Sequence, residues 1–145
     1  MRRTMWIAIA LFSLGSVSAC SAPPPYAIFE EPQTDVDRVS VDGLGPEGAV
    51  LNADSTRNLG SHDGNTFYVA KVAQDEGDPI EPVVCLIAFS DEASDVSASG
   101  CATNPSSDMQ MQTPTANVIL IPDDYDRTSL PGGDWVELHR NLLSR

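Results

Sequence analysis

The sequence has few positive charges, and this scarcity excludes a first class of functions. Its 145 residues include 8 Lys or Arg against 21 Asp or Glu, which gives a formal net charge of −13 at pH 7. Proteins that bind nucleic acid neutralise phosphates with clustered Lys and Arg side chains. We therefore expect no nucleic-acid partner. A negative net charge is also repelled by an anionic membrane surface. A simpler explanation of this charge is that it keeps an exposed domain soluble.

Histidine and cysteine are also scarce. The chain has 2 His and 3 Cys and no CxxC pair, whereas structural zinc sites combine four such ligands at short spacings. The GxSxG motif of a nucleophile elbow is missing as well. Ser61, His62 and Asp63 are consecutive, and neighbours in a strand point to opposite faces, so they are unsuited to form a catalytic triad. We expect no catalytic residues, no metal site, no cofactor and no enzymatic activity.

Three further motifs have simpler explanations than the functions they suggest. Met109 and Met111 fall on one face of a strand, where thioethers can bind Cu(I), but two methionines packed against a sheet explain the spacing. The run Gly43–Gly48 matches GxGxxG without the strand and helix that a dinucleotide site needs. The acidic runs 75–78 and 123–126 suggest weak calcium sites, but they lack EF-hand spacing and are typical of solvated turns.

No apolar run is long enough to span a membrane permanently. The longest run near the N-terminus, Met5–Leu14, covers ten residues, whereas a spanning helix needs about 20. It follows Arg2 and Arg3 and precedes a stretch of small residues. This order is typical of a secretory signal peptide. The sequence therefore predicts a removable signal peptide over residues 1–19.

The last residues of this signal peptide and the cysteine after them form a second motif. Val17, Ser18, Ala19 and Cys20 together resemble the bacterial lipobox. The resemblance implies that the thiol of Cys20 receives a diacylglyceryl group and that Cys20 becomes the first residue of the mature chain. Two acyl chains anchor a protein stably, whereas one holds it only marginally. We expect an exported protein held by lipid at the outer face of the cell membrane. The alternative is an ordinary cleavage site and a soluble secreted protein.

Lipidation of Cys20 leaves Cys85 and Cys101 as an even pair. In an oxidising compartment such a pair is expected to form a disulfide. The two cysteines lie 16 positions apart (101 minus 85), and a bridge that closes a loop of this size stabilises a fold by about 3 kcal/mol. The alternative is two unpaired buried thiols.

The mature chain divides into a linker and one domain. Residues 20–50 contain five prolines and many acids and are predicted to form a lipid-anchored, proline-rich tether. As a free coil this tether would span roughly 30 Å on average. Its apolar stretch 26–30 is a candidate for docking on the domain. Residues 51–145 are predicted to form a small β-rich extracytoplasmic domain, because the 126 mature residues (145 minus 19) suit a single domain.

Short strands separated by turns dominate this domain. Asp63-Gly64 predicts a hairpin, and the run 83–89 is apolar on both faces, as in a central buried strand. The run 96–102 can return beside it and bring Cys101 near Cys85. Further strands are expected at 109–113, 116–122 and 135–143, with short helical turns around 47–53 and within 123–134. We expect a mainly β fold, a small antiparallel sheet curled into a sandwich or partial barrel with at most one or two short helices.

Several stretches of the mature part resemble small, uncharacterised exported lipoproteins of actinobacteria. These stretches are STRNLGSHDGNTFYVAKV, VVCLIAF, GCA and IPDDYDRTSLPGGDWVELHRNLL. The resemblance implies a small surface-displayed domain and no assigned activity. The sequence therefore favours a non-enzymatic binding or envelope-associated module, and it does not identify the protein or small-molecule partner. The alternative is an enzyme, or a solute- or metal-binding envelope component, whose site is not visible in the sequence.

Overall fold

The computed structural model describes residues 24–46, 49–74, 83–93, 95–102, 104 and 106–145. The predicted signal peptide and Cys20 lie outside the described residues. The described strands are β1 (Arg57–His62), β2 (Asn65–Lys71), β3 (Val84–Ser90), β4 (Val96–Ala102), β5 (Met109–Gln112), β6 (Asn117–Leu120), β7 (Val136–His139) and β8 (Leu142–Ser144). The short 3-10 helices are η1 (Ala27–Glu30), η2 (Asp35–Asp37), η3 (Ala53–Ser55) and η4 (Arg127–Ser129).

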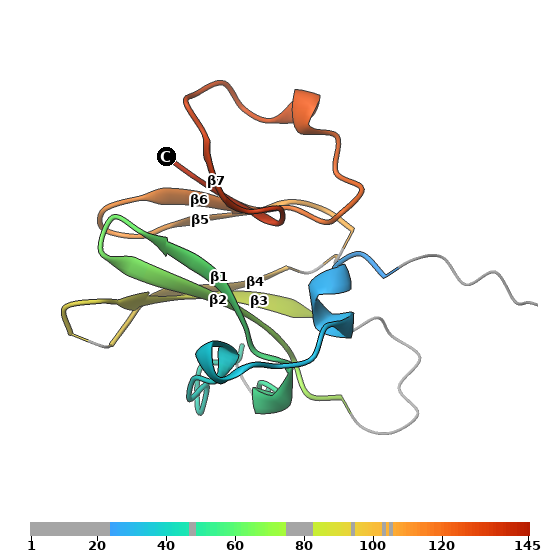
Figure 1. Cartoon of the computed structure of the whole chain (residues 1–145), viewed down its shortest axis with the longest axis vertical. Coiled ribbons are helices and arrows are strands. Elements are labelled where there is room, and N and C mark those ends of the chain that lie inside the picture. The colour runs from blue at the N-terminus through green and yellow to red at the C-terminus, as the bar shows by residue number, and fades with distance from the viewer. Residues whose placement is uncertain (1–23, 47–48, 75–82, 94, 103, 105) are drawn as a thin grey trace, which may run out of the picture.

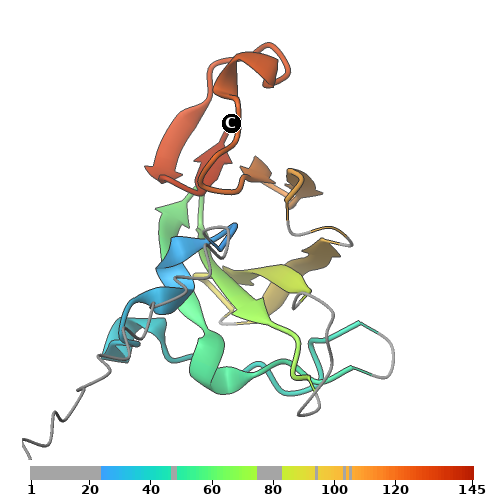
Figure 2. The ribbon, with the colours of Figure 1, turned by 90° about the vertical axis from the view of Figure 1, so that its right-hand side faces the viewer.

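The strands form two antiparallel sheets that face each other. The first sheet has the order β1-β2-β3-β4 and the second the order β5-β6-β8-β7, and Figures 1 and 2 show them as two stacked layers. Strand β1 lies beside β7, and β4 lies beside β5, but the sheets are not closed into a barrel. This confirms the predicted mainly β fold. Among the described residues no helix is long and apolar enough to cross a membrane.

The main core lies between the two sheets. Phe67 and Leu86 from the first sheet and Val118 and Leu142 from the second are at most 1% exposed and belong to one cluster. Side chains alternate between the faces of a strand, so every second residue of these strands enters this core. The core is therefore built from both halves of the domain.

The first sheet follows the sequence prediction closely. Asp63 and Gly64 have φ of 48° and 73°, the positive values that a tight two-residue hairpin turn requires. Strand β2 pairs with β3 throughout its length. Strand β3 pairs with β4 from Val84 to Phe89, with a register shift between Ala88 and Phe89. Residues Val84 to Ala88 are all buried, which confirms β3 as a central strand covered on both faces.

The C-terminal residues were predicted as a single strand over 135–143, and this prediction is wrong. The chain turns back at Arg140 and Asn141, so that β7 and β8 form a hairpin and β8 lies between β6 and β7. The side chain of Asn141 is fully buried. Its Nδ2 donates to the carbonyl of Ile121 at 3.0 Å and to Asp123 Oδ1 at 2.8 Å. These bonds fix the turn and explain why the strand is interrupted there.

The helical turn expected around 47–53 also lies elsewhere. Leu51 instead forms an isolated antiparallel bridge with Val72, and the 3-10 helix η3 begins after it. Asn52 Oδ1 accepts a hydrogen bond from the Asp54 N–H at 3.0 Å and caps this helix. The turn expected within 123–134 is present as η4, where Asp126 Oδ1 accepts from the Thr128 N–H at 3.0 Å.

The described part of the predicted tether is packed on the domain. Tyr26 and Ile28 are 2% and 5% exposed and belong to the core between the sheets, so the expected docking of residues 26–30 is confirmed. Val41, further along, is buried against Cys85 and Ile87 on the outer face of the first sheet. The free-coil span expected for this segment therefore does not apply to residues 24–46.

Hydrogen bonds fasten this N-terminal segment to the first strand. The Asp37 carboxylate accepts from the Asn58 N–H at 2.9 Å and from the Thr34 N–H at 2.7 Å. Arg57 Nη2 donates to the carbonyl of Glu31 at 2.6 Å. Burial raises the pKa of Asp37, but the hydrogen bonds from Thr34 and Asn58, together with Arg57, outweigh it and hold the pKa below its usual value. The segment is thus held by buried polar contacts as well as by apolar packing.

Tyr26 gives a first prediction, on alkaline pH. Its hydroxyl is buried without a hydrogen-bond partner among the described residues, and burial, with Asp108 and Asp123, raises its pKa above the ordinary value of 10.0. A raised pKa stabilises the folded protein below about pH 10, and this contribution is lost as the pH rises further. We expect the free energy of unfolding to fall more steeply between pH 9.5 and 11.5 in the native chain than in Tyr26→Phe. Urea titrations measure both curves, and parallel curves would contradict the expectation.

Candidate functional site

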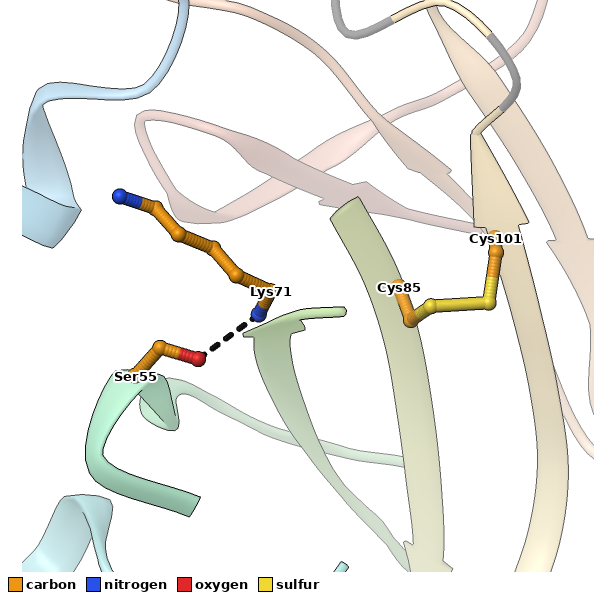
Figure 3. The surroundings of a disulfide bond; sticks show 4 residues. All are labelled: Ser55, Lys71, Cys85 and Cys101. Carbon is orange, nitrogen blue, oxygen red and sulfur yellow. Dashed lines mark hydrogen bonds between the residues drawn. A yellow bond between two sulfur atoms is a disulfide. The ribbon is translucent and has the colours of Figure 1, made fainter. Parts of the chain in front are cut away.

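The disulfide joins the central strand β3 to the edge strand β4 of the first sheet. Cys85 in β3 and Cys101 in β4 are direct register partners, with an S–S distance of 2.08 Å and a Cα–Cα distance of 3.9 Å (Figure 3). The predicted pairing is present in the structure. Cys85 is fully buried on the outer face of the sheet, beneath the N-terminal segment. The bridge therefore stabilises the part of the sheet that this segment covers.

The 3-10 helices η1 and η3 lie at the end of the first sheet where β2 ends, near the disulfide. The Lys71 N–H donates to Ser55 Oγ at 2.8 Å, as Figure 3 shows, and Lys71 Nζ lies 4.6 Å from the centroid of the Phe29 ring. The contact between the ammonium group and the ring is a cation–π interaction. Lys71 thus joins both 3-10 helices to the end of β2.

The outer face of the first sheet carries the disulfide at one end and a groove at its other end. Val41 and Leu51, with Val39 and Leu44 beside them, pack over Ala70, Cys85 and Ile87. They leave open the part of the face around Tyr68 and Phe89. The groove has a volume of about 440 Å³, within the range of roughly 300–1,000 Å³ typical of ligand sites. Its lining residues are Val39, Ser40, Thr66, Tyr68, Phe89, Ser90 and Asp91.

Two aromatic rings from neighbouring strands lie in this groove. Tyr68 and Phe89 pack edge to face, with ring centroids 5.7 Å apart and planes at 90°. A hydroxyl chain borders them, in which Ser61 Oγ lies 2.7 Å from Thr66 Oγ1 and Thr66 Oγ1 donates to Asp91 Oδ1 at 2.7 Å. Asp91 is the charged residue among those that line the groove. The arrangement provides an apolar surface next to a negative charge.

The histidines lie outside this groove. His62 Nε2 is 3.3 Å from Asp63 Oδ2, while Ser61 is bonded to Thr66, so the three consecutive residues do not form a catalytic triad. His139 Nδ1 accepts from the Asn141 N–H at 3.2 Å. Burial and the neighbouring Arg140 lower the pKa of His139 against the opposing effect of nearby carboxylates. His139 therefore supports the β7–β8 turn.

A second, smaller cavity of about 230 Å³ lies among the tips of three hairpins. Asn65 is 3% exposed at its centre. Asn65 Nδ2 donates to Thr115 Oγ1 at 2.8 Å, and Asn65 Oδ1 accepts from Ser97 Oγ at 2.7 Å. Thr115 Oγ1 in turn donates to the carbonyl of Asp63 at 2.6 Å. This partly buried network joins the β1–β2, β3–β4 and β5–β6 turns and fixes the end of the sandwich that holds Asp91.

The remaining candidate motifs have structural roles where they are described. Met109 and Met111 are packed against the main core, as the simpler explanation predicted. Asp123 accepts from the Ala27 N–H at 2.6 Å and pairs with Arg140 Nε at 3.4 Å. The acidic run 75–78 lies outside the described residues. Within the described part of the chain no group of three or more His, Cys, Asp or Glu is placed to hold a metal ion.

Sequence reasoning did not find the groove, because its lining residues come from three distant segments. Val39 and Ser40 belong to the segment predicted as a tether, and Tyr68 and Phe89 face the same side of neighbouring strands. The available signal was the outward-facing aromatic residue on each of two predicted strands. Comparisons with known protein families, curated proteins and solved structures find no match for this chain.

Proposed function

We propose that this protein is an exported lipoprotein, held at the outer face of the cell membrane by lipid on Cys20, and that its β domain is a non-enzymatic binding module. The observation that carries the binding role is the aromatic groove beside Asp91 on the open half of the first sheet. The motif Val17–Cys20 supports the anchoring. The alternative of an envelope enzyme gains no support from the groove, because neither histidine lines it.

The groove lies towards the opposite end of β2 from η1, the element next to which the proposed anchor would be attached. Helix η1 lies at the Lys71 end of β2, where the Lys71 ammonium contacts Phe29, whereas Thr66 in the groove lies five positions earlier in the same strand. At about 3.3 Å per residue, this separation is roughly 17 Å. In Figure 1, η1 and the tip of the β1–β2 hairpin lie at opposite ends of the domain. A chain anchored before η1 would present the groove on the side away from the lipid.

The packed N-terminal segment also limits how far the domain can move from its anchor. Cys20 precedes Pro24, the first described residue, by four positions. Four residues span at most about 14 Å even when fully extended. A lipidated Cys20 would therefore hold the domain close to the membrane. This short reach favours partners that are themselves at or near the membrane surface.

Replacing Cys20 tests the anchoring. We expect the native chain in the membrane fraction. Its intact mass should equal that of a chain that begins at Cys20 and carries a diacylglyceryl group. The Cys20→Ala chain should lack this mass, because it has no thiol to modify. Ser21→Ala is the matched control and should remain lipidated. Recovery of the native chain without lipid from the culture medium would contradict the proposal.

A further inference from the structure

We propose that the groove binds an extended, cationic peptide segment of a partner protein, with a Lys or Arg side chain beside Asp91 and Tyr68 and an apolar side chain against Phe89 and Val39. This inference rests on the proposed binding function and specifies its ligand. Charge, ring geometry and shape support it independently.

Charge is the first argument. The lining residues include one carboxylate, Asp91, and no Lys or Arg. The hydrogen bond that Asp91 accepts from Thr66 comes from a neutral hydroxyl and leaves the negative charge uncompensated. Asp42 adds a second carboxylate beside the groove, since Ser40 Oγ lies 3.4 Å from Asp42 Oδ2. A cationic ligand is therefore complementary to the groove, and an acidic one is not.

The protein's own cations are engaged elsewhere. The described contacts are Arg38 with Asp35, Arg57 with the Glu31 carbonyl, Lys71 with Phe29, Arg127 with Glu137, Arg140 with Asp123, and Arg145 with Trp135. These are all the Lys and Arg residues after the predicted signal peptide. A cation that pairs with Asp91 would therefore come from another molecule.

The aromatic rings are the second argument. Lys71 over Phe29 and Arg145 over Trp135, each at 4.6 Å from the ring centroid, show that this domain already uses cation–π contacts. Tyr68 offers the same type of surface to a cation from a ligand. Because the Tyr68 and Phe89 planes are perpendicular, they do not form the flat platform on which a sugar ring would stack. They suit an inserted side chain better.

The shape of the groove is the third argument. Its floor is the β2–β3 face, and its wall is the segment at Val39 and Ser40. The preceding residue, Arg38, has extended backbone angles of φ −82° and ψ 113°. A groove that is open to solvent between a sheet and a segment outside helices and strands matches an extended chain. Successive side chains of such a chain alternate in direction, so one can reach the rings while the next remains in solvent.

The test uses a cationic probe and an acidic one. The probes are acetyl-Lys-Trp-Lys-Leu-Lys-amide and acetyl-Glu-Trp-Glu-Leu-Glu-amide, titrated by calorimetry and by backbone amide chemical shifts into the lipidated chain in non-ionic detergent. Chitotetraose serves as an uncharged sugar probe. We expect the cationic peptide alone to bind, with the largest shifts at Thr66, Tyr68, Phe89 and Asp91, and with affinity that weakens as salt rises.

Variants separate the ring from the charge. Tyr68→Ala and Asp91→Asn should each weaken binding of the cationic peptide about fivefold, and Asp91→Asn should also reduce the salt dependence. Tyr68→Phe keeps the ring and should retain full affinity. Asp124→Asn is the charge-matched control in an exposed loop of the second sheet and should bind like the native chain. Native affinity in both Tyr68→Ala and Asp91→Asn would overturn the inference.

The probes also distinguish this inference from the proposed function. Binding of the acidic peptide or of chitotetraose at the groove would retain the binding module and overturn the cationic ligand. If none of the three probes shifts the groove residues, both the inference and the use of this groove are contradicted. The mass measurement tests the anchoring through Cys20 separately. A failure of the groove proposal therefore does not contradict the anchoring, and a failure of the anchoring does not contradict the groove proposal.

Discussion

Tyr26→Ala is expected to lower the free energy of unfolding by about 3 kcal/mol. Tyr26 is 2% exposed and packs in the core between the sheets with Ile28 and Phe67, so truncation leaves a cavity that both sheets line. Urea unfolding followed by circular dichroism measures the change. Substitution of a residue in a free, exposed tether would change stability by only about 0.5 kcal/mol, which makes this variant a direct test of the docked N-terminal segment.

Two controls make the result specific. Tyr26→Phe keeps the ring and removes a buried hydroxyl that has no described partner, so it should be as stable as the native chain or more stable. Val36 lies in the same segment but is 70% exposed, and Val36→Ala should change stability by no more than about 0.5 kcal/mol. If Tyr26→Ala has as small an effect as Val36→Ala, the segment is not docked in solution.

Loss of the disulfide is the second large expected effect. The double variant Cys85→Ala/Cys101→Ala should lose about 3 kcal/mol of stability, because the bridge closes a loop with a sequence separation of 16. For a domain of this size, the loss corresponds to a fall in Tm of about 10 °C. Thermal unfolding measured by circular dichroism gives the difference directly.

Reducing agent provides the matched control for this prediction. Dithiothreitol should lower the Tm of the native chain towards that of the double variant and leave the double variant unchanged. The stabilisation reflects mainly the restricted unfolded chain, so it depends on the covalent bond rather than on the packing of the two side chains. A native Tm that is insensitive to complete reduction, verified by thiol titration, would contradict this account.

The sequence predicted the first sheet well because its signals are local. Asp63-Gly64 favours positive φ at both turn positions, and the apolar run from Val84 to Phe89 has the composition of a strand buried on both faces. Once β3 and β4 are antiparallel neighbours, Cys85 and Cys101 lie opposite each other. The predicted pairing thus followed from adjacent elements joined by a short turn.

The second sheet was harder to predict because β8 is inserted between β6 and β7. The run 135–143 has strand-like composition throughout, and nothing in its periodicity marks the turn at Asn141. The turn depends on the buried Asn141 side chain, which reaches Ile121 and Asp123 from a distant part of the chain. Such long-range polar contacts exist only after the sheet has formed.

The groove was beyond prediction for a similar reason. Its wall comes from Val39 and Ser40, which lie in a proline-rich, acidic stretch with the local features of a linker. Asp91, which supplies the carboxylate of the groove, lies in a turn whose sequence is typical of solvent-exposed turns. The hydroxyl chain from Ser61 through Thr66 to Asp91 becomes visible only when three strand ends are brought together.

The sequence by itself determined the mainly β architecture, the β1–β2 hairpin and the pairing of the two cysteines between adjacent strands, because turn residues and strand periodicity act over a few neighbouring positions. The tertiary structure alone decided that residues 24–46 are packed, that β8 lies between β6 and β7, and that an aromatic groove is left open beside Asp91. Tyr26 and Ile28 are buried because the facing sheets leave space for them. That space is formed by residues far away in the sequence, so the short segment around Tyr26 and Ile28 cannot reveal it.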